Sequence, residues 1–170
     1  MEGIYKEYYE SGKIFKEINF INDKENGQGK IYYEDGKILR IVNLKNGKEN
    51  GEVIDYYPNG KLKEKDSFKN GKREGESIIY YENGNVKQKS TFKNDKREGD
   101  LFIYYPSGKL RQTEKFINGK AEGEVIEYYE NGVVKEKAYF INDKQEKEHF
   151  FYDEKGKLIK TDIYKNGVKQ

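Results

Sequence analysis

The sequence predicts an all-β fold, an elongated single antiparallel β-sheet meander of about seven 24-residue β-hairpin repeats. Two columns of turn residues carry this prediction. Glycines that follow one or two tyrosines recur every 24 residues, at Gly12, Gly36, Gly60, Gly84, Gly108, Gly132 and Gly156. Asparagines followed by Gly or Asp keep the same period, at Asn22, Asn46, Asn70, Asn94, Asn118, Asn142 and Asn166. Two turn signals in every repeat leave room for strands but little for a helix.

The composition agrees with a folded repeat protein. Charged residues reach 38% and apolar residues only 34%, values that alone would suggest disorder. Aromatic residues nevertheless make up 15% of the chain and stand in strict register with the repeat. The repeats fill the sequence, so we expect a single repeat domain over residues 1–170.

The third repeat illustrates the expected strands. Residues 52–57 are rich in β-forming side chains, and residues 61–68 form a second run. Pro58-Asn59-Gly60 separates the two runs, and Asn70-Gly71 follows the second. Asn-Gly between strand-like segments is the strongest short hairpin signal.

The type of the tyrosine turn decides which residues share a face. Proline at position 58 suits the second position of a type I turn, with Gly60 left-handed in a three-residue loop. Tyr56 then pairs with Leu62, the interpretation that we favour. A two-residue type I′ turn would instead pair Tyr57 with Leu62 and place the second tyrosine of each pair on the buried face.

On the favoured interpretation, the buried face is formed by four columns: the first tyrosines, the phenylalanines such as Phe68, the column of Ile38, Leu62, Val86, Leu110, Val134 and Leu158, and the column of Ile54, Ile78, Phe102, Ile126 and Phe150. The other face carries the second tyrosines and lysines of the second strands. Its candidate binding residues are Tyr33, Tyr57, Tyr81, Tyr105, Tyr129, Lys63 and Lys87, and we expect Lys65, Lys89, Lys135 and Lys137 there as well.

The asparagine turns predict a basic edge. Its candidate binding residues are Lys48, Lys72, Arg73, Lys96, Arg97 and Lys120. Glu74 and Glu98 lie close by and partly cancel this charge. Two interpretations explain this row of basic residues. They are either solvated turn residues or a recognition stripe for an acidic partner.

The repeat unit resembles a known family. The pattern G-E-x-x-x-Y-Y-x-N-G-x-L-K-x-K-x-x-F-x-N-G-K, seen over residues 75–96 with Asp95 in place of the final Gly, is similar to the MORN-variant repeat of bacteria. The resemblance covers essentially all seven repeats and implies a binding or scaffolding module. Proteins built from this repeat are commonly labelled antitoxin components of toxin–antitoxin systems. A phosphatidylinositol phosphate kinase label, where one occurs, would come from the repeats and not from a catalytic domain.

The sequence offers no catalytic motif. It contains no P-loop and no G-x-S-x-G, and it lacks cysteine. The one histidine, His149, is expected to be a capping or surface residue, and no histidine pair is present for a zinc site. We therefore expect neither an enzyme, nor a cofactor, nor a metal.

The first hypothesis for function is a non-catalytic scaffold for protein–protein interaction, with an antitoxin role as one case. The alternative is a peripheral binder of anionic phospholipid headgroups at the basic edge. A net charge of +2 argues against nucleic acid. End-to-end self-association through edge strands is a further expectation. The sequence shows neither a signal peptide nor a transmembrane segment, which favours the cytoplasm.

Overall fold

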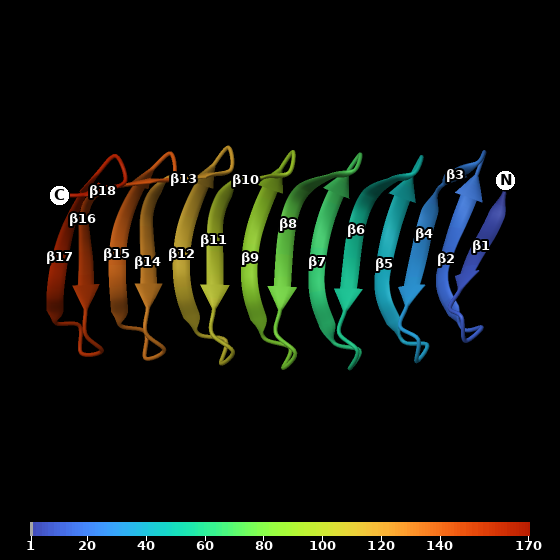
Figure 1. Ribbon diagram of the computed structural model, residues 1–170, viewed down its shortest axis with the longest axis horizontal. Helices are drawn as coiled ribbons and strands as arrows, with labels where there is room; N and C mark the ends of the chain where they lie inside the picture. Colours follow the sequence, from blue (N-terminus) through green and yellow to red (C-terminus); the bar gives the residue numbers. More distant parts are fainter. Residues whose placement is uncertain (1) are drawn as a thin grey trace. The chain divides into compact units, whose positions relative to one another are not determined.

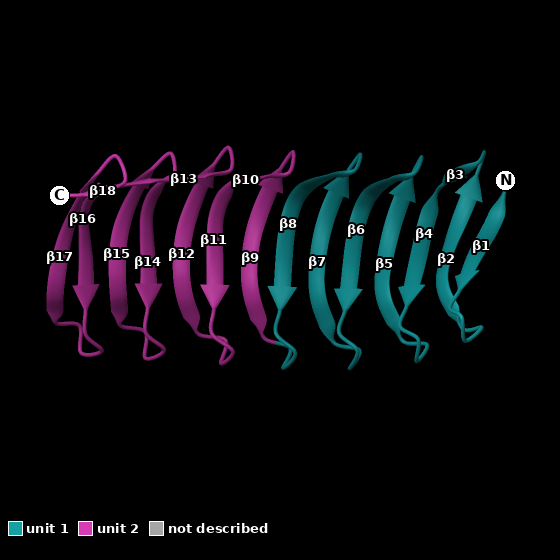
Figure 2. Ribbon diagram, in the orientation of Figure 1, with its two compact units in different colours: residues 1–84 teal, residues 85–170 magenta. Residues whose placement is uncertain are grey.

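The computed structural model describes residues 2–170, and all of its strand pairs are antiparallel (Figure 1). The chain divides into two compact units, residues 1–84 and residues 85–170 (Figure 2), and each is described by itself. The predicted fold class, an all-β antiparallel sheet of hairpin repeats, is confirmed.

In the first unit, successive strands pair along the chain, except that β3 and β4 both pair with β2. The strands are β1 (Gly3–Tyr8), β2 (Ile14–Ile21), β3 (Lys24–Glu25), β4 (Gly27–Tyr32), β5 (Ile38–Lys45), β6 (Lys48–Tyr56), β7 (Leu62–Lys69) and β8 (Lys72–Tyr80).

The second unit repeats this plan, with β9 pairing with β10 and β11, and β12 pairing with β13 and β14. Its strands are β9 (Val86–Lys93), β10 (Lys96–Arg97), β11 (Gly99–Tyr104), β12 (Leu110–Ile117), β13 (Lys120–Ala121), β14 (Gly123–Tyr128), β15 (Val134–Ile141), β16 (Lys144–Tyr152), β17 (Leu158–Lys165) and β18 (Val168–Lys169).

The tyrosine turns are the three-residue loops that the prolines favoured. The Gly60 amide donates to the Tyr57 carbonyl at 2.8 Å, and the Tyr57 amide donates to the Lys61 carbonyl at 2.8 Å. Gly60 is left-handed, with φ of 82°. Tyr56 pairs with Leu62, as predicted, and the type I′ alternative does not apply here.

The asparagine turns are two-residue loops. Lys45 pairs with Lys48 across Asn46 and Gly47, whose φ angles are 52° and 75°. Two successive positive φ values define the type I′ turn, which suits Asn-Gly and matches the right-handed twist of the strands. Each repeat thus alternates a three-residue and a two-residue hairpin loop.

Within each unit, a β-bulge beside the tyrosine turns changes the face that the following residues of the strand occupy. In the third repeat, Tyr56 pairs with Leu62 but Asp55 pairs with Glu64, so Lys63 is an extra residue. Because one extra residue reverses the alternation of a strand, the residues of β7 after Lys63 lie on the face opposite to the predicted one, whereas Ile54 and Ile78 still share a face through Lys65.

The predicted buried face is therefore wrong. Val53 and Asp66 are directly paired and only 2% and 5% exposed, on the face opposite to Tyr56 and Leu62. Their columns hold most of the buried side chains of the described residues, both apolar and polar: Ile18, Val42, Ser77, Ser90, Leu101, Ala138 and Asp162. The first tyrosines and the columns of Leu62 and Ile54 are half-buried or exposed, because no second layer covers them. The phenylalanines are half-buried as well and lie on the same face as Val53, since Phe68 pairs with Gly51.

Within each unit, two kinds of side-chain hydrogen bond join successive repeats. The second tyrosine of a pair donates its hydroxyl to the carbonyl of the first tyrosine one repeat later, as from Tyr33 to Tyr56 and from Tyr105 to Tyr128, both at 2.7 Å. At the asparagine turns, an acidic or amide side chain accepts a hydrogen bond from the main-chain amide of the turn asparagine in the next repeat, as Glu98 does from Asn118 at 2.8 Å. These joints satisfy backbone groups that the strand ladders leave open.

Within residues 2–170, no helix has the length and apolar character needed to cross a membrane.

Candidate functional site

One face of each unit carries the second tyrosines, and we call it the tyrosine face. Its ring contacts identify it: the rings of Tyr9 and Phe15 lie 5.1 Å apart, and the Arg111 guanidinium lies 5.8 Å from the Tyr105 ring. The candidates Tyr33, Tyr57, Tyr105 and Tyr129 are half-buried, and their hydroxyls are used in the joints between repeats. Tyr81 is half-buried at the equivalent position of the first unit.

The bulge divides the lysines predicted for this face. Lys135 occupies the bulge position and contacts Glu127 on the tyrosine face at 3.1 Å. By the same position in their repeats, the candidates Lys63 and Lys87 belong to this face. Lys65 pairs with Ile54, and Lys137 pairs with Ile126, so these two and the equivalent Lys89 lie on the opposite face. The expectation for Lys65, Lys89 and Lys137 is therefore wrong.

Two arginines predicted for the basic edge lie on the tyrosine face instead. The Arg73 guanidinium contacts Asp66 at 3.1 Å and Glu64 at 3.5 Å. The Arg97 guanidinium lies 5.8 Å and 5.5 Å from the ring centres of Phe92 and Phe116. Arginines pair with carboxylates and stack on aromatic rings. The basic edge therefore consists of lysines alone.

The candidate edge lysines Lys48, Lys72, Lys96 and Lys120 are all exposed. The Lys48 stem lies over the next asparagine turn, where a side chain on Gly71 would meet it at 3.6 Å, and Lys96 lies over Gly119 in the same way. The alkyl stems of these two lysines thus lie against the neighbouring asparagine turn in each unit.

The side chains of the tyrosine face differ strongly from repeat to repeat. The column just before the tyrosine pair lies on this face and contains Glu7, Ile31, Asp55, Ile79, Ile103, Glu127 and Phe151. The adjacent column on the opposite face is apolar from the third repeat on, with Ile54, Ile78, Phe102, Ile126 and Phe150. One regular framework thus presents side chains on the tyrosine face that change from repeat to repeat.

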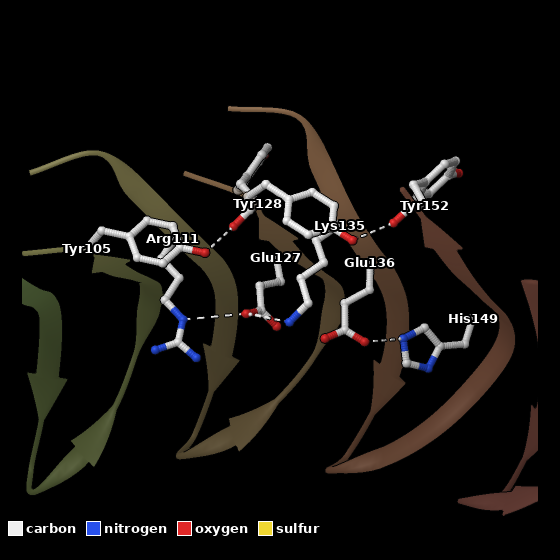
Figure 3. Close-up of polar contacts among 9 residues, drawn as sticks. Tyr105, Arg111, Glu127, Tyr128, Lys135, Glu136, His149 and Tyr152 are labelled. Carbon is white, nitrogen blue, oxygen red and sulfur yellow. Dashed lines mark hydrogen bonds and ion pairs between the residues drawn. The ribbon is translucent and has the colours of Figure 1, made fainter. Parts of the chain in front are cut away.

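A cluster of charged groups occupies the tyrosine face of the second unit (Figure 3). Glu127 Oε1 accepts from Arg111 Nε at 3.4 Å and from Lys135 Nζ at 3.1 Å. Glu136 is the direct cross-strand partner of Glu127, and its Oε2 lies 3.0 Å from His149 Nε2. The strands bend around these side chains, which point toward one another in Figure 3.

His149 is a member of this cluster. Its side chain is 14% exposed, its Nδ1 lies 2.7 Å from Gln145 Nε2, and its ring stacks on Phe151 with 4.0 Å between the ring centres. The prediction of a capping or surface histidine is therefore wrong, because His149 occupies the column of the buried Val53 and Leu101.

The two glutamates titrate differently. Burial, the hydrogen bond with Glu127 and the charge of Glu127 raise the pKa of Glu136 above its usual value. Burial would also raise the pKa of Glu127, but the hydrogen bonds from Glu136 and Lys135 outweigh it and hold this pKa below its usual value. Of the pair, Glu136 is the carboxylate that lacks a strong cationic partner.

A pocket of about 190 Å³ opens beside the cluster. Apolar side chains form part of its lining, namely Val125, Ala138 and Phe140, together with the polar Gln112, Glu127, Glu136 and His149. An apolar wall with a few convergent polar groups is typical of a ligand site.

The first unit has an equivalent cluster in its third repeat. Asp55 and Glu64 pair across the strands, as Glu127 and Glu136 do. Here two arginines of the chain itself reach the carboxylates: Arg40 Nε lies 3.5 Å from Asp55, and Arg73 contacts Glu64. Burial, before any charge effect, raises the pKa of both Asp55 and Glu64.

Sequence reasoning did not single out these paired acids. A signal was present, since Asp55 and Glu127 directly precede tyrosine pairs in a column that is otherwise mostly apolar. Without the bulge, however, Glu64 and Glu136 would have been placed on the opposite face. In residues 2–170, histidine and acidic side chains form no group of three that could hold a metal ion.

Comparison with known proteins identifies the repeats. A search of curated proteins found no match. The family model described as MORN repeat variant matches seven successive segments: residues 1–22, 25–46, 49–70, 73–94, 97–118, 121–142 and 145–166. These segments cover most of the chain, and only repeats are matched. The chain therefore belongs to the MORN repeat variant family.

Proposed function

We propose that this protein is a non-catalytic repeat scaffold that binds a protein partner through its tyrosine face. The observation that carries the proposal is the contrast between the constant joints of the repeats and the varied side chains of the tyrosine face. The joints between repeats are the same along each unit, whereas the tyrosine-face columns change from acidic to apolar to basic. A surface with varied side chains on a rigid frame can discriminate between partners, because each position rewards or penalises a different group.

The physical make-up of this face supports a protein as the partner. Half-buried tyrosines, arginines and charged pairs lie next to one another, and tyrosine and arginine are enriched in protein interfaces. A toxin protein masked by this face would be one such partner, in line with the antitoxin role expected for this repeat.

The test compares two lysines that differ in little but the face they occupy. Lys135 lies on the tyrosine face and is 42% exposed, while Lys137 lies on the opposite face and is 40% exposed. Each pairs with one glutamate, at 3.1 Å and 2.8 Å. The chain is co-expressed with the product of the neighbouring gene, and the complex is purified and its dissociation constant measured.

We expect Lys135→Glu to weaken the complex at least about tenfold and Lys137→Glu to leave it nearly unchanged. Equal losses, or a loss with Lys137→Glu alone, would contradict the assignment to the tyrosine face. Salt-sensitive binding to phosphatidylserine vesicles that disappears with Lys72→Glu and Lys96→Glu would instead favour the phospholipid alternative.

A further inference from the structure

The pocket beside Glu136 lacks two cations that the equivalent place in the first unit has. Arg40 and Arg73 contact Asp55 and Glu64 there. Three repeats later, the positions of these arginines hold Gln112 and Gln145. The strand register is the same in both places: Arg40 pairs with Asp55 as Gln112 pairs with Glu127, and Phe68 pairs with Arg73 as Phe140 pairs with Gln145.

The carboxylates remain although the arginines are replaced. Glu127 and Glu136 keep the places of Asp55 and Glu64, and Glu127 is only 13% exposed. Arg111 and Lys135 both approach the same oxygen of Glu127, and both are more than two-fifths exposed. Glu136 contacts only the imidazole of His149 among the ion pairs of the described chain. The Glu136 side chain is half-buried, 29% exposed, beside a second carboxylate, so a cation that reached it would be favourable.

The cavity has the right lining for a guanidinium on an alkyl stem. Val125, Ala138 and Phe140 offer apolar contact for methylene groups, and the carboxylate of Glu136 offers a charge-assisted hydrogen bond. Ala138 stands where Asp66 stands in the first unit, which widens the space next to Glu136.

We propose that this pocket receives an arginine side chain of the partner protein. The guanidinium would pair with Glu136 in the way that Arg73 pairs with Glu64, and Gln112 would supply its side-chain amide oxygen as a further acceptor. The proposal rests on the proposed function, because it names the group that a partner presents to the tyrosine face.

The test uses a small probe, so that no partner has to be known. The ¹⁵N-labelled full chain is titrated with N-acetyl-L-arginine amide and, as a control of the same shape without charge, N-acetyl-L-citrulline amide. We expect saturable shifts of amide signals in β14, β15 and β16, and at least about tenfold weaker binding of the citrulline probe, because a charge-assisted pair is lost. Equal binding of the two probes, or shifts confined to other strands, would overturn the proposal.

Three variants sharpen the result. Glu136→Gln should weaken arginine binding about tenfold, and Gln145→Arg should abolish it by filling the pocket from within, as Arg73 does in the first unit. Glu64→Gln is the matched control and should leave probe binding unchanged. Circular dichroism checks that each variant is folded, and retained binding by folded Gln145→Arg would count against the pocket.

The test of the arginine pocket and the test of the proposed function can fail independently of each other. A partner that is lost with Lys135→Glu but is held normally by both Glu136→Gln and Gln145→Arg would leave the proposed function standing and overturn the arginine pocket. Probe binding that follows the expected pattern would support the pocket even if the neighbouring gene's product is not the partner.

Discussion

The hydroxyl of Tyr57 donates a hydrogen bond to the main-chain carbonyl of Tyr80, at 2.7 Å. Donor and acceptor belong to successive repeats, so the bond ties one hairpin to the next. The tyrosine pair therefore has two separate roles: the second residue supplies the hydroxyl and the first supplies the carbonyl.

Removing this hydroxyl should loosen the joint between repeats. We expect Tyr57→Phe to lower the free energy of unfolding by about 1 kcal/mol, because the Tyr80 carbonyl loses its side-chain partner. Urea unfolding followed by circular dichroism measures the effect. Tyr56→Phe is the control, since no hydrogen bond of the Tyr56 hydroxyl is found in residues 2–170, and a loss as large as that of Tyr57→Phe would contradict the prediction.

The turn glycine at position 84 can be tested by two replacements. Gly84 has a φ of 96°, and a Cβ placed there would meet no atom within 4 Å, so any cost comes from the backbone alone. We expect Gly84→Val to cost about 1–2 kcal/mol in urea unfolding, and Gly84→Asn to cost clearly less, because asparagine tolerates the left-handed region. Equal costs would show that side-chain size rather than backbone conformation matters there.

The joint at the asparagine turns depends on an acceptor, not on a charge. Asn50 accepts from the Asn70 amide at 3.2 Å, at the position where Glu98 accepts from Asn118. We expect Glu98→Ala to cost about 1 kcal/mol and Glu98→Asn to cost little, because asparagine already fills this position in other repeats. Thermal melting of the two variants measures the difference, and an Asn variant as unstable as the Ala variant would assign the effect to charge.

The pH dependence of stability should change when Glu114 loses its charge. Burial raises the pKa of Glu114, against the opposing charge of Arg97. A raised pKa in the folded state means that folding takes up a proton, so Glu114 lowers stability as the pH rises from its unfolded pKa to its folded pKa.

We therefore expect Glu114→Gln to be as stable as the parent or more stable at neutral pH. Its advantage should shrink as the pH falls through this window and vanish below the ordinary pKa of glutamate. Melting temperatures between neutral and acidic pH test this, with the exposed Glu130→Gln as the control. An advantage that grows toward acidic pH would show that the sign is wrong.

The repeat period and the turn chemistry were sufficient to predict the fold class, the two kinds of hairpin and the pairing of Tyr56 with Leu62. They did not correctly predict which face of the sheet each residue occupies. A period of 24 shows which residues are equivalent, but it does not show where a strand gains an extra residue, and the bulge at Lys63 reverses the faces of the residues that follow it in β7.

The prediction of which side chains are buried failed for a second reason. In a sheet with no covering layer, the large side chains of both faces keep contact with solvent, so size does not identify the core. The side chains of Val53 and Ser77 are fully enclosed because they are short and are covered by their longer neighbours. Arg73 and Arg97 were placed at the edge from their distance to the turn, yet paired acids and aromatic rings draw them onto the tyrosine face.

The joints between repeats also bear on how such a chain can change in evolution. Within each unit, a repeat donates the hydroxyl of its second tyrosine to the next repeat, and neither this joint nor the one at the asparagine turns uses the columns that hold Glu127 and Glu136. Duplication or loss of a whole 24-residue segment would recreate the same joint at the new boundary. The columns of Glu127 and Glu136 on the tyrosine face can meanwhile diverge without breaking these joints, so that the chemistry of this face can change while the hydrogen bonds between repeats are kept.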